Sequence, residues 1–144
     1  GYVSRMDNLQ ATILNFRIKA LKKTIKLRRA NFKIYLKNLN NKRVFFPKEK
    51  IDEFNTYHTF VIQVDNRDKL KKFLKRKGIN TSIHYPIPIH FQKAYRKIYS
   101  KKENYTNAEN QAKRILTLPI NQFLKKKEIL YICKAINNFY KKHD

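Results

Sequence analysis

The chain is poor in glycine, cysteine and long apolar runs, and each shortage narrows the possible functions. Gly1 and Gly78 are its only glycines, so it has no glycine-rich loop to hold a phosphate, which excludes P-loop and dinucleotide-binding proteins. Cys133 is the only cysteine. It lies in an apolar run, which predicts a buried side chain and suits a cytoplasmic protein without an internal disulfide. No apolar run reaches roughly 18 residues, and we expect no membrane-spanning helix.

Acidic residues are also few, since 34 lysines and arginines face 10 aspartates and glutamates, for a formal charge of +24. Such a charge attracts polyanions and anionic metabolites. The lysines are nevertheless spread through every segment instead of gathering on one aromatic-rich face, and Lys, Asn, Ile, Tyr and Phe all have A/T-rich codons. A low-GC genome is a sufficient explanation, so we expect no specific nucleic-acid binding. The alternative is a non-catalytic basic module or a gene remnant that binds polyanions or a partner protein.

Residues 1–40 predict a long amphipathic helix, single or joined from two by a kink, that ends near Leu39. Its apolar stripe recurs every seven residues, at Met6, Ile13, Ala20, Leu27 and Ile34. Ser4 and Asp7 have the spacing of a capping box and place the helix start at Ser4. A helix of this length exceeds what one small domain can cover. We therefore expect part of the stripe to pack on a large domain or a second subunit.

Residues 41–144 have the pattern of a small α/β domain with about three strands. Strands are expected over 43–47, 57–64 and 81–85, and helices over 66–77, 106–116 and 125–140. Gly78 stands where a left-handed residue ends a helix. Thr106 and Glu109 have the spacing of a second capping box.

The stretch 78–95 is the most informative part of the chain, because it contains the run His-Tyr-Pro-Ile-Pro-Ile-His. Pro86 and Pro88 lack an N–H donor and keep the residues before them extended. The result is a rigid lip that carries two imidazoles and a phenol, on His84, Tyr85 and His90. Such a lip can form the wall of a small-molecule site. The other interpretation is an edge strand with a proline-terminated exit.

Four segments resemble, in order, the pyridoxal-phosphate-dependent sugar aminotransferases of the DegT/DnrJ/StrS family. They match its Gly-x-Asn-x-Arg-Met segment, its central strand, its His-Tyr-Pro segment and its Leu-Ser-Leu-Pro segment, at 1–11, 57–61, 78–95 and 116–120. The resemblance implies the C-terminal small domain of a fold-type-I aminotransferase, with about three mainly antiparallel strands packed with helices. Residues 1–40 would be the interdomain helix and 41–144 the small domain. Since the chain opens inside the first motif, we expect it to be the tail of a longer protein, with the large pyridoxal-phosphate-binding domain absent from it.

The resemblance also implies where function lies. His84, Tyr85 and His90 would contact the sugar substrate. Arg5 matches an arginine near the cofactor or the dimer interface, whereas Val3 stands where the family usually has an asparagine that reaches the cofactor phosphate of the neighbouring subunit. The Schiff-base lysine belongs to the large domain, so we expect no catalytic residue here and no transamination by this chain alone. No metal is expected, because the two histidines lack a nearby carboxylate or thiol.

The function that the resemblance implies is amino-group transfer from an amino acid, such as glutamate, to a nucleotide-linked keto sugar. The enzyme would be a cytoplasmic homodimer with pyridoxal phosphate, and its products would feed polysaccharide biosynthesis. The His-Tyr-Pro-x-Pro-x-His form of the lip points to 3-keto sugars.

Overall fold

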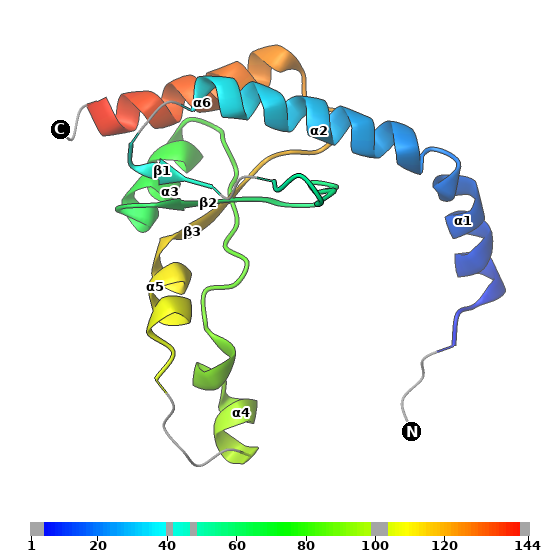
Figure 1. The fold of residues 1–144 in the computed structure, drawn as a ribbon, viewed down its shortest axis with the longest axis horizontal. Helices are drawn as coiled ribbons and strands as arrows, with labels where there is room; N and C mark the ends of the chain where they lie inside the picture. Colours follow the sequence, from blue (N-terminus) through cyan, green and yellow to red (C-terminus); the bar gives the residue numbers. More distant parts are fainter. Residues whose placement is uncertain (1–4, 40–41, 47–48, 99–103, 142–144) are drawn as a thin grey trace.

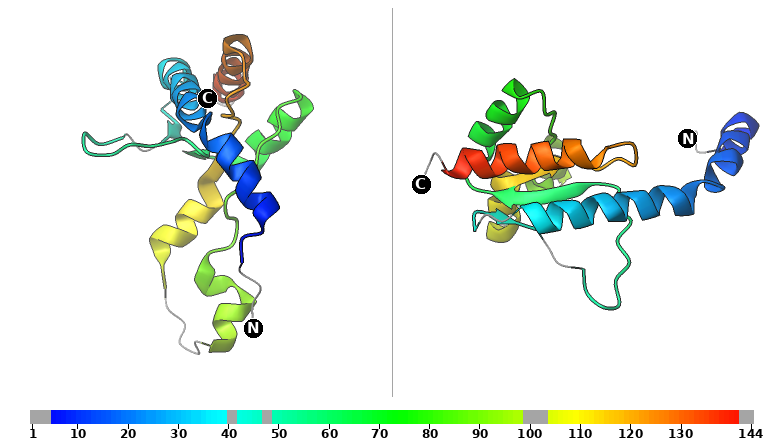
Figure 2. Two further views of the ribbon diagram at one scale, coloured as in Figure 1. Left: turned by 90° about the vertical axis from the view of Figure 1, so that its right-hand side faces the viewer. Right: turned by 90° about the horizontal axis from the view of Figure 1, so that it is seen from above.

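The computed structural model describes residues 5–39, 42–46, 49–98 and 104–141 and shows an α/β fold. A three-stranded sheet carries α2, α3 and α6 on one side, while α4 and α5 extend from the other (Figures 1 and 2). The helices are α1 (Asn8–Ile18), α2 (Leu21–Asn38), α3 (Arg67–Arg76), α4 (Lys93–Ile98), α5 (Thr106–Arg114) and α6 (Lys126–Lys141), with a 3-10 turn, η1, at Ile89–Phe91; the strands are β1 (Val44–Phe45), β2 (Phe60–Val64) and β3 (Ile115–Leu118). In these ranges no helix combines the length and the apolarity needed to cross a membrane.

The sheet is antiparallel throughout, as expected, with β2 between β1 and β3. The strand expected over 81–85 is wrong, because this segment makes only one isolated bridge, from Ser82 to Thr117. The third strand is instead β3, where we expected the end of a helix. It pairs with β2 along four positions, from Phe60 opposite Leu118 to Gln63 opposite Ile115. Because Ile115 and Leu116 pair with β2, the helix expected over 106–116 ends at Arg114.

The N-terminal arm, α1 together with α2, consists of two helices and not one. Of the two forms expected for residues 1–40, the structure shows the pair of helices joined by a kink. α1 ends at Ile18, and α2 starts after Ala20, whose carbonyl accepts the first bond of the new helix from Thr24 at 3.0 Å. Asp7 is the N-cap residue of α1. The expected capping box with Asp7 in the first turn is therefore wrong, and Ser4 lies outside the described residues.

The two helices of the arm differ in what they bury. α1 buries none of its residues and turns away from the sheet (Figures 1 and 2). α2 packs beside α6 and buries Asn31, Phe32 and Tyr35. The apolar stripe expected along the whole arm is thus covered only toward the end of α2, since Leu21 and Leu27 are 48% and 41% exposed.

The core lies between the sheet and the pair α2 and α6. The buried side of α6 comprises Ile129, Ile132, Cys133, Ala135, Ile136, Phe139 and Tyr140. The hydroxyl of Tyr140 donates to the Asp65 carbonyl at 2.7 Å, and burial raises its pKa to about 12. Cys133 is 2% exposed, and burial likewise raises the pKa of its thiol to about 12. Such a thiol is a structural hydrophobe and not a nucleophile.

Gly78 ends α3 as expected, at a φ of +73°. Its N–H donates to the Lys75 carbonyl at 3.0 Å, and the N–H of Ile79 donates to the Leu74 carbonyl at 2.9 Å. These two bonds form a Schellman motif, which satisfies carbonyls that the helix end would leave free. The motif turns the chain from α3 into the segment that leads to the lip.

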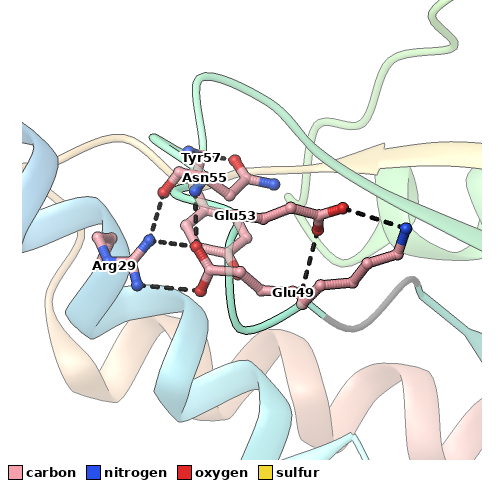
Figure 3. A network of polar contacts seen from close by, with 6 residues as sticks. Arg29, Glu49, Glu53, Asn55 and Tyr57 are labelled. Carbon is pink, nitrogen blue, oxygen red and sulfur yellow. Dashed lines mark hydrogen bonds and ion pairs between the residues drawn. The ribbon is translucent and has the colours of Figure 1, made fainter.

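The connection between β1 and β2 is fastened to α2 by one carboxylate (Figure 3). Both Nη atoms of Arg29 donate to Glu49, at 2.6 and 2.9 Å, and the Asn55 N–H adds a third bond at 2.6 Å. The guanidinium also lies 4.5 Å from the ring centroid of Phe54. Its bond to Glu49 is the main reason why the pKa of that carboxyl lies below its ordinary value, with the Asn55 N–H next in weight.

Candidate functional site

A groove of about 590 Å³ opens between the lip and α5 and is the candidate site. Its size is that of a small-molecule pocket. His84, Tyr85 and His90 all line it, together with Tyr95 of α4 and Tyr105 before α5. The other lining side chains are aliphatic or amide, namely Ile87, Pro88, Ile89, Gln92, Ala108, Gln111, Ala112 and Ile115. The structure therefore brings the three sequence-predicted residues to one wall.

The lip leaves the sheet at the Ser82 bridge. Ser82 and Thr117 exchange two backbone hydrogen bonds, of 3.2 and 2.8 Å, which place the start of the lip beside β3. Beyond this bridge the chain passes Pro86 and Pro88 and forms η1. The peptide bond between His84 and Tyr85 is cis. The lip is thus fixed to the sheet at the Ser82 bridge, and Tyr85, Pro86 and Ile87 beyond it are exposed.

His84 is tied to the sheet through its ring. Its Nδ1 lies 2.9 Å from the Thr117 hydroxyl oxygen, on a residue that is 8% exposed. Because Nδ1 is occupied by this contact, Nε2 is the ring nitrogen left for a ligand. Tyr85 is 74% exposed and lies edge-on to the His84 ring. The phenol therefore stands at the rim of the groove.

His90 is tied to α5. Its Nε2 lies 3.1 Å from Oε1 of Glu109, and the two side chains are 9% and 19% exposed. The rings of Phe91 and Tyr105 lie 4.2 and 4.9 Å from the imidazole, measured between centroids. The expected capping box at Thr106 is wrong, since Tyr105 is the N-cap residue of α5 and Glu109 bonds to His90 instead.

The described lining of the groove consists of imidazole, phenol, amide and aliphatic side chains. Among the described residues it includes neither lysine nor arginine, and no carboxylate. A pyridoxal phosphate site needs a lysine for the aldimine and a carboxylate for the pyridine nitrogen. This groove therefore does not fit the cofactor by itself, and no cofactor-dependent step follows from these residues. The described part of the chain also has no cluster of three or more histidine, cysteine, aspartate or glutamate side chains able to hold a metal.

The remaining sequence candidates lie elsewhere. Arg5 is exposed and leads into α1, which Figure 1 shows on the opposite side of the molecule from α5. Its role toward a cofactor stays a prediction, and Val3 lies outside the described residues. The position of His58 near the start of a strand predicts a core histidine. This prediction is wrong, because His58 is exposed, and it is not part of the groove.

Thr117 and Glu109 are the hydrogen-bond partners of the two groove histidines that sequence reasoning missed. Thr117 follows the apolar alternation of a strand, and Glu109 fits a capping box, so each had an ordinary local explanation. The signal that was available is the pair of imidazoles itself, because a buried ring nitrogen needs a hydrogen-bond partner. Only the fold shows which residues supply it.

Several known proteins are similar to this chain in sequence or in fold. A Geobacillus stearothermophilus protein named pleiotropic regulatory protein is 33% identical over 98% of this chain and 39% of its own length. The dTDP-3-amino-3,6-dideoxy-α-D-galactopyranose transaminase of Aneurinibacillus thermoaerophilus is 32% identical over 96% of this chain and 38% of its own. The structure of Streptomyces venezuelae DesV, in complex with a ketimine intermediate, matches 96% of this chain and 38% of that protein, with a TM-score of 0.89 and 30% identity.

The chain thus spans less than two fifths of the relatives that it matches. The family model for the DegT/DnrJ/EryC1/StrS aminotransferases matches residues 1–137, nearly the whole chain. The relatives include transaminases of nucleotide-linked sugars. The chain belongs to the DegT/DnrJ/EryC1/StrS aminotransferase family.

Proposed function

We propose that this chain is the C-terminal, sugar-facing part of a nucleotide-sugar aminotransferase. The whole enzyme would move an amino group from an amino acid, such as glutamate, to a nucleotide-linked keto sugar. The observation that carries the proposal is the groove, which collects His84, Tyr85 and His90 on one wall in a chain of this family. An exposed surface of scattered lysines would not produce such a pocket.

The chemistry of the lining indicates which part of the substrate it meets. Proteins bind the diphosphate of a nucleotide-linked sugar through cationic side chains or backbone N–H groups. The described lining has no lysine or arginine. A sugar ring needs hydrogen-bonding groups for its hydroxyls and apolar or aromatic surface for its carbons. His84, Tyr85 and His90 supply the first, and Ile87 with Ile115 supplies the second. The groove is therefore proposed to hold the sugar and not the diphosphate.

The cofactor and the assembly are further parts of this proposal. In the whole enzyme, pyridoxal phosphate and its lysine would belong to a large domain that precedes Gly1, and Arg5 would lie near the cofactor or the interface of a homodimer. The supporting observation is that α1, directly after Arg5, buries none of its residues in this chain. A cytoplasmic location is proposed as well, in keeping with the single cysteine.

A chimera tests the proposal. Residues 1–144 replace the matching segment of the Aneurinibacillus transaminase, and conversion of its dTDP-3-amino sugar with 2-oxoglutarate is measured. We expect activity in the chimera. We expect His84→Ala to lower kcat/KM by about tenfold to a hundredfold, the loss for one or two polar contacts to a substrate.

His58→Ala is the matched control, because this histidine is exposed and lies outside the groove. It should keep the activity of the chimera. A folded chimera with bound cofactor but no activity would contradict the proposal and favour the non-catalytic basic module. DNA binding whose affinity falls steeply with salt, without sequence preference, is what the +24 charge alone predicts for that alternative.

A further inference from the structure

Within the groove, the two histidines differ in the kind of partner that holds them. The partner of His84 is a hydroxyl, on Thr117, which can donate or accept a hydrogen bond. The partner of His90 is a carboxylate, on Glu109, which can only accept when ionised. The two rings therefore have different freedom to change which nitrogen carries the proton.

We infer that Glu109 is a positioning residue that holds the proton of His90 on Nε2, so that Nδ1 accepts a hydroxyl hydrogen from the ligand. This inference rests on the proposed function, because it concerns the same groove. The contact between Nε2 and Oε1 is 3.1 Å long, which is within the range of an N–H···O bond. In the neutral imidazole one nitrogen donates and the other accepts. With Nε2 donating to Glu109, Nδ1 is left as the acceptor.

The residues around His90 stabilise its hydrogen bond to Glu109 and the orientation of its ring. The side chains of His90 and Glu109 are only 9% and 19% exposed, so water competes poorly for their hydrogen bond. Tyr105 and Phe91 contact the imidazole with centroid distances of 4.9 and 4.2 Å. A flip of the ring, which would put Cε1 in the place of Nε2, would have to break the bond to Glu109 and move against these two rings.

A fixed acceptor selects among ligands. A hydroxyl on the sugar can donate to Nδ1 of His90, whereas a carbonyl oxygen or a fluorine at the same place would face a lone pair with no hydrogen between them. His84 has no such restriction, since the Thr117 hydroxyl adapts to either tautomer. The groove would thus require a hydroxyl beside His90 and tolerate a hydroxyl or a carbonyl beside His84. The ligand class is a sugar that keeps a free hydroxyl at the position next to His90.

The first experiment measures the ring protons of His90 by nuclear magnetic resonance in the 15N-labelled chain, assigned through His90→Gln. We expect a slowly exchanging proton on Nε2. Glu109→Ala should abolish its slow exchange, and Glu109→Gln, which keeps an acceptor oxygen, should restore it in part. Glu53→Ala is the matched control, because it removes an acidic residue outside the groove. A fast-exchanging Nε2 proton in the unsubstituted chain, or one unaffected by Glu109→Ala in a folded variant, would overturn the role of Glu109.

The second experiment titrates the chain with dTDP-glucose and with three analogues in which fluorine replaces one sugar hydroxyl, at C2, C3 or C4. We expect one analogue to bind about tenfold more weakly, as for loss of one hydrogen bond of about 1.4 kcal/mol. That difference should vanish in Glu109→Ala and persist in Glu53→Ala. Equal affinities for all three analogues would overturn the ligand assignment. Absence of dTDP-glucose binding would contradict the proposed function, while the Nε2 proton would still decide the role of Glu109.

Discussion

At the scale of single residues, Glu49 shows how much one carboxylate can organise. It accepts three hydrogen bonds, two from Arg29 and one from Asn55, and thereby fastens the connection between β1 and β2 to Arg29 of α2, which lies 20 residues earlier in the sequence. These donors favour the ionised form and lower its pKa below the ordinary value of 4.5. The stability that Glu49 contributes must therefore depend on pH.

We predict that this contribution is complete above the ordinary pKa of about 4.5 and is lost as the pH falls through the lower pKa of the folded state. The sign follows because the unfolded chain takes up the proton first on acidification. Glu49→Gln should destabilise the chain at neutral pH and progressively less in acid, as measured by urea midpoints from about pH 7 to pH 3. Glu53→Gln, on the same connection, serves as control. A difference between Glu49→Gln and the unsubstituted chain that stays constant with pH would refute the prediction.

Single residues also show where sequence reasoning succeeds and where it stops. His84, Tyr85 and His90 lie close together in the chain, and two prolines restrict the backbone between them, so their meeting in one groove could be predicted. Glu109 and Thr117 are 19 and 33 residues from their imidazole partners. Contacts over such separations depend on the whole fold, and no local sequence pattern predicts them.

At the scale of elements, Gly78 carries a prediction because its φ of +73° is unfavourable for residues with a Cβ. A Cβ built at Gly78 meets nothing within 4 Å, so Gly78→Ala adds backbone strain without a clash. We expect a loss of about 1 to 2 kcal/mol in the free energy of unfolding. Gly78→Asn should lose less, because asparagine tolerates the left-handed region. Urea unfolding of the two variants checks this, and equal stability of both with the unsubstituted chain would contradict it.

The elements that the sequence predicts best are those with a long apolar period. α3 and α6 lie where the pattern places them, within one residue at each end. β3 was missed because Ile115–Leu118 is only four residues long and continues the apolar side of α5. Its strand geometry comes from pairing with β2, and periodicity cannot separate a short buried strand from a helical turn.

At the scale of the whole molecule, α1 differs from the other long helices because its apolar side chains are exposed. Leu9, Ile13 and Phe16 are 72%, 49% and 77% exposed, and the helix buries none of its residues. An apolar helix surface of this kind favours association. The separation of an interdomain helix over 1–40 from a small domain over 41–144 stays a prediction, which the exposed side of α1 supports.

We predict that the isolated chain self-associates despite its charge. Replacing Leu9, Ile13 and Phe16 by glutamine should shift the chain toward a monomer in sedimentation velocity. The matched control replaces the exposed Lys22, Lys23 and Lys26 of α2 by glutamine, which lowers the repulsion between chains and should not reduce association. A monomeric, cooperatively unfolding chain without any substitution would contradict this prediction.

Labelling of the buried Cys133 thiol can measure local opening of the core. It is the only thiol in the sequence, it is 2% exposed, and it lies in the core between α6 and the rest of the fold. A thiol reagent can reach it only while α6 is separated from that core. The rate of labelling therefore depends on how often this local opening occurs. The labelling rate of Cys133 therefore reports local opening of the core without any substitution in the chain, and a ligand that binds the folded chain in the groove should slow that rate.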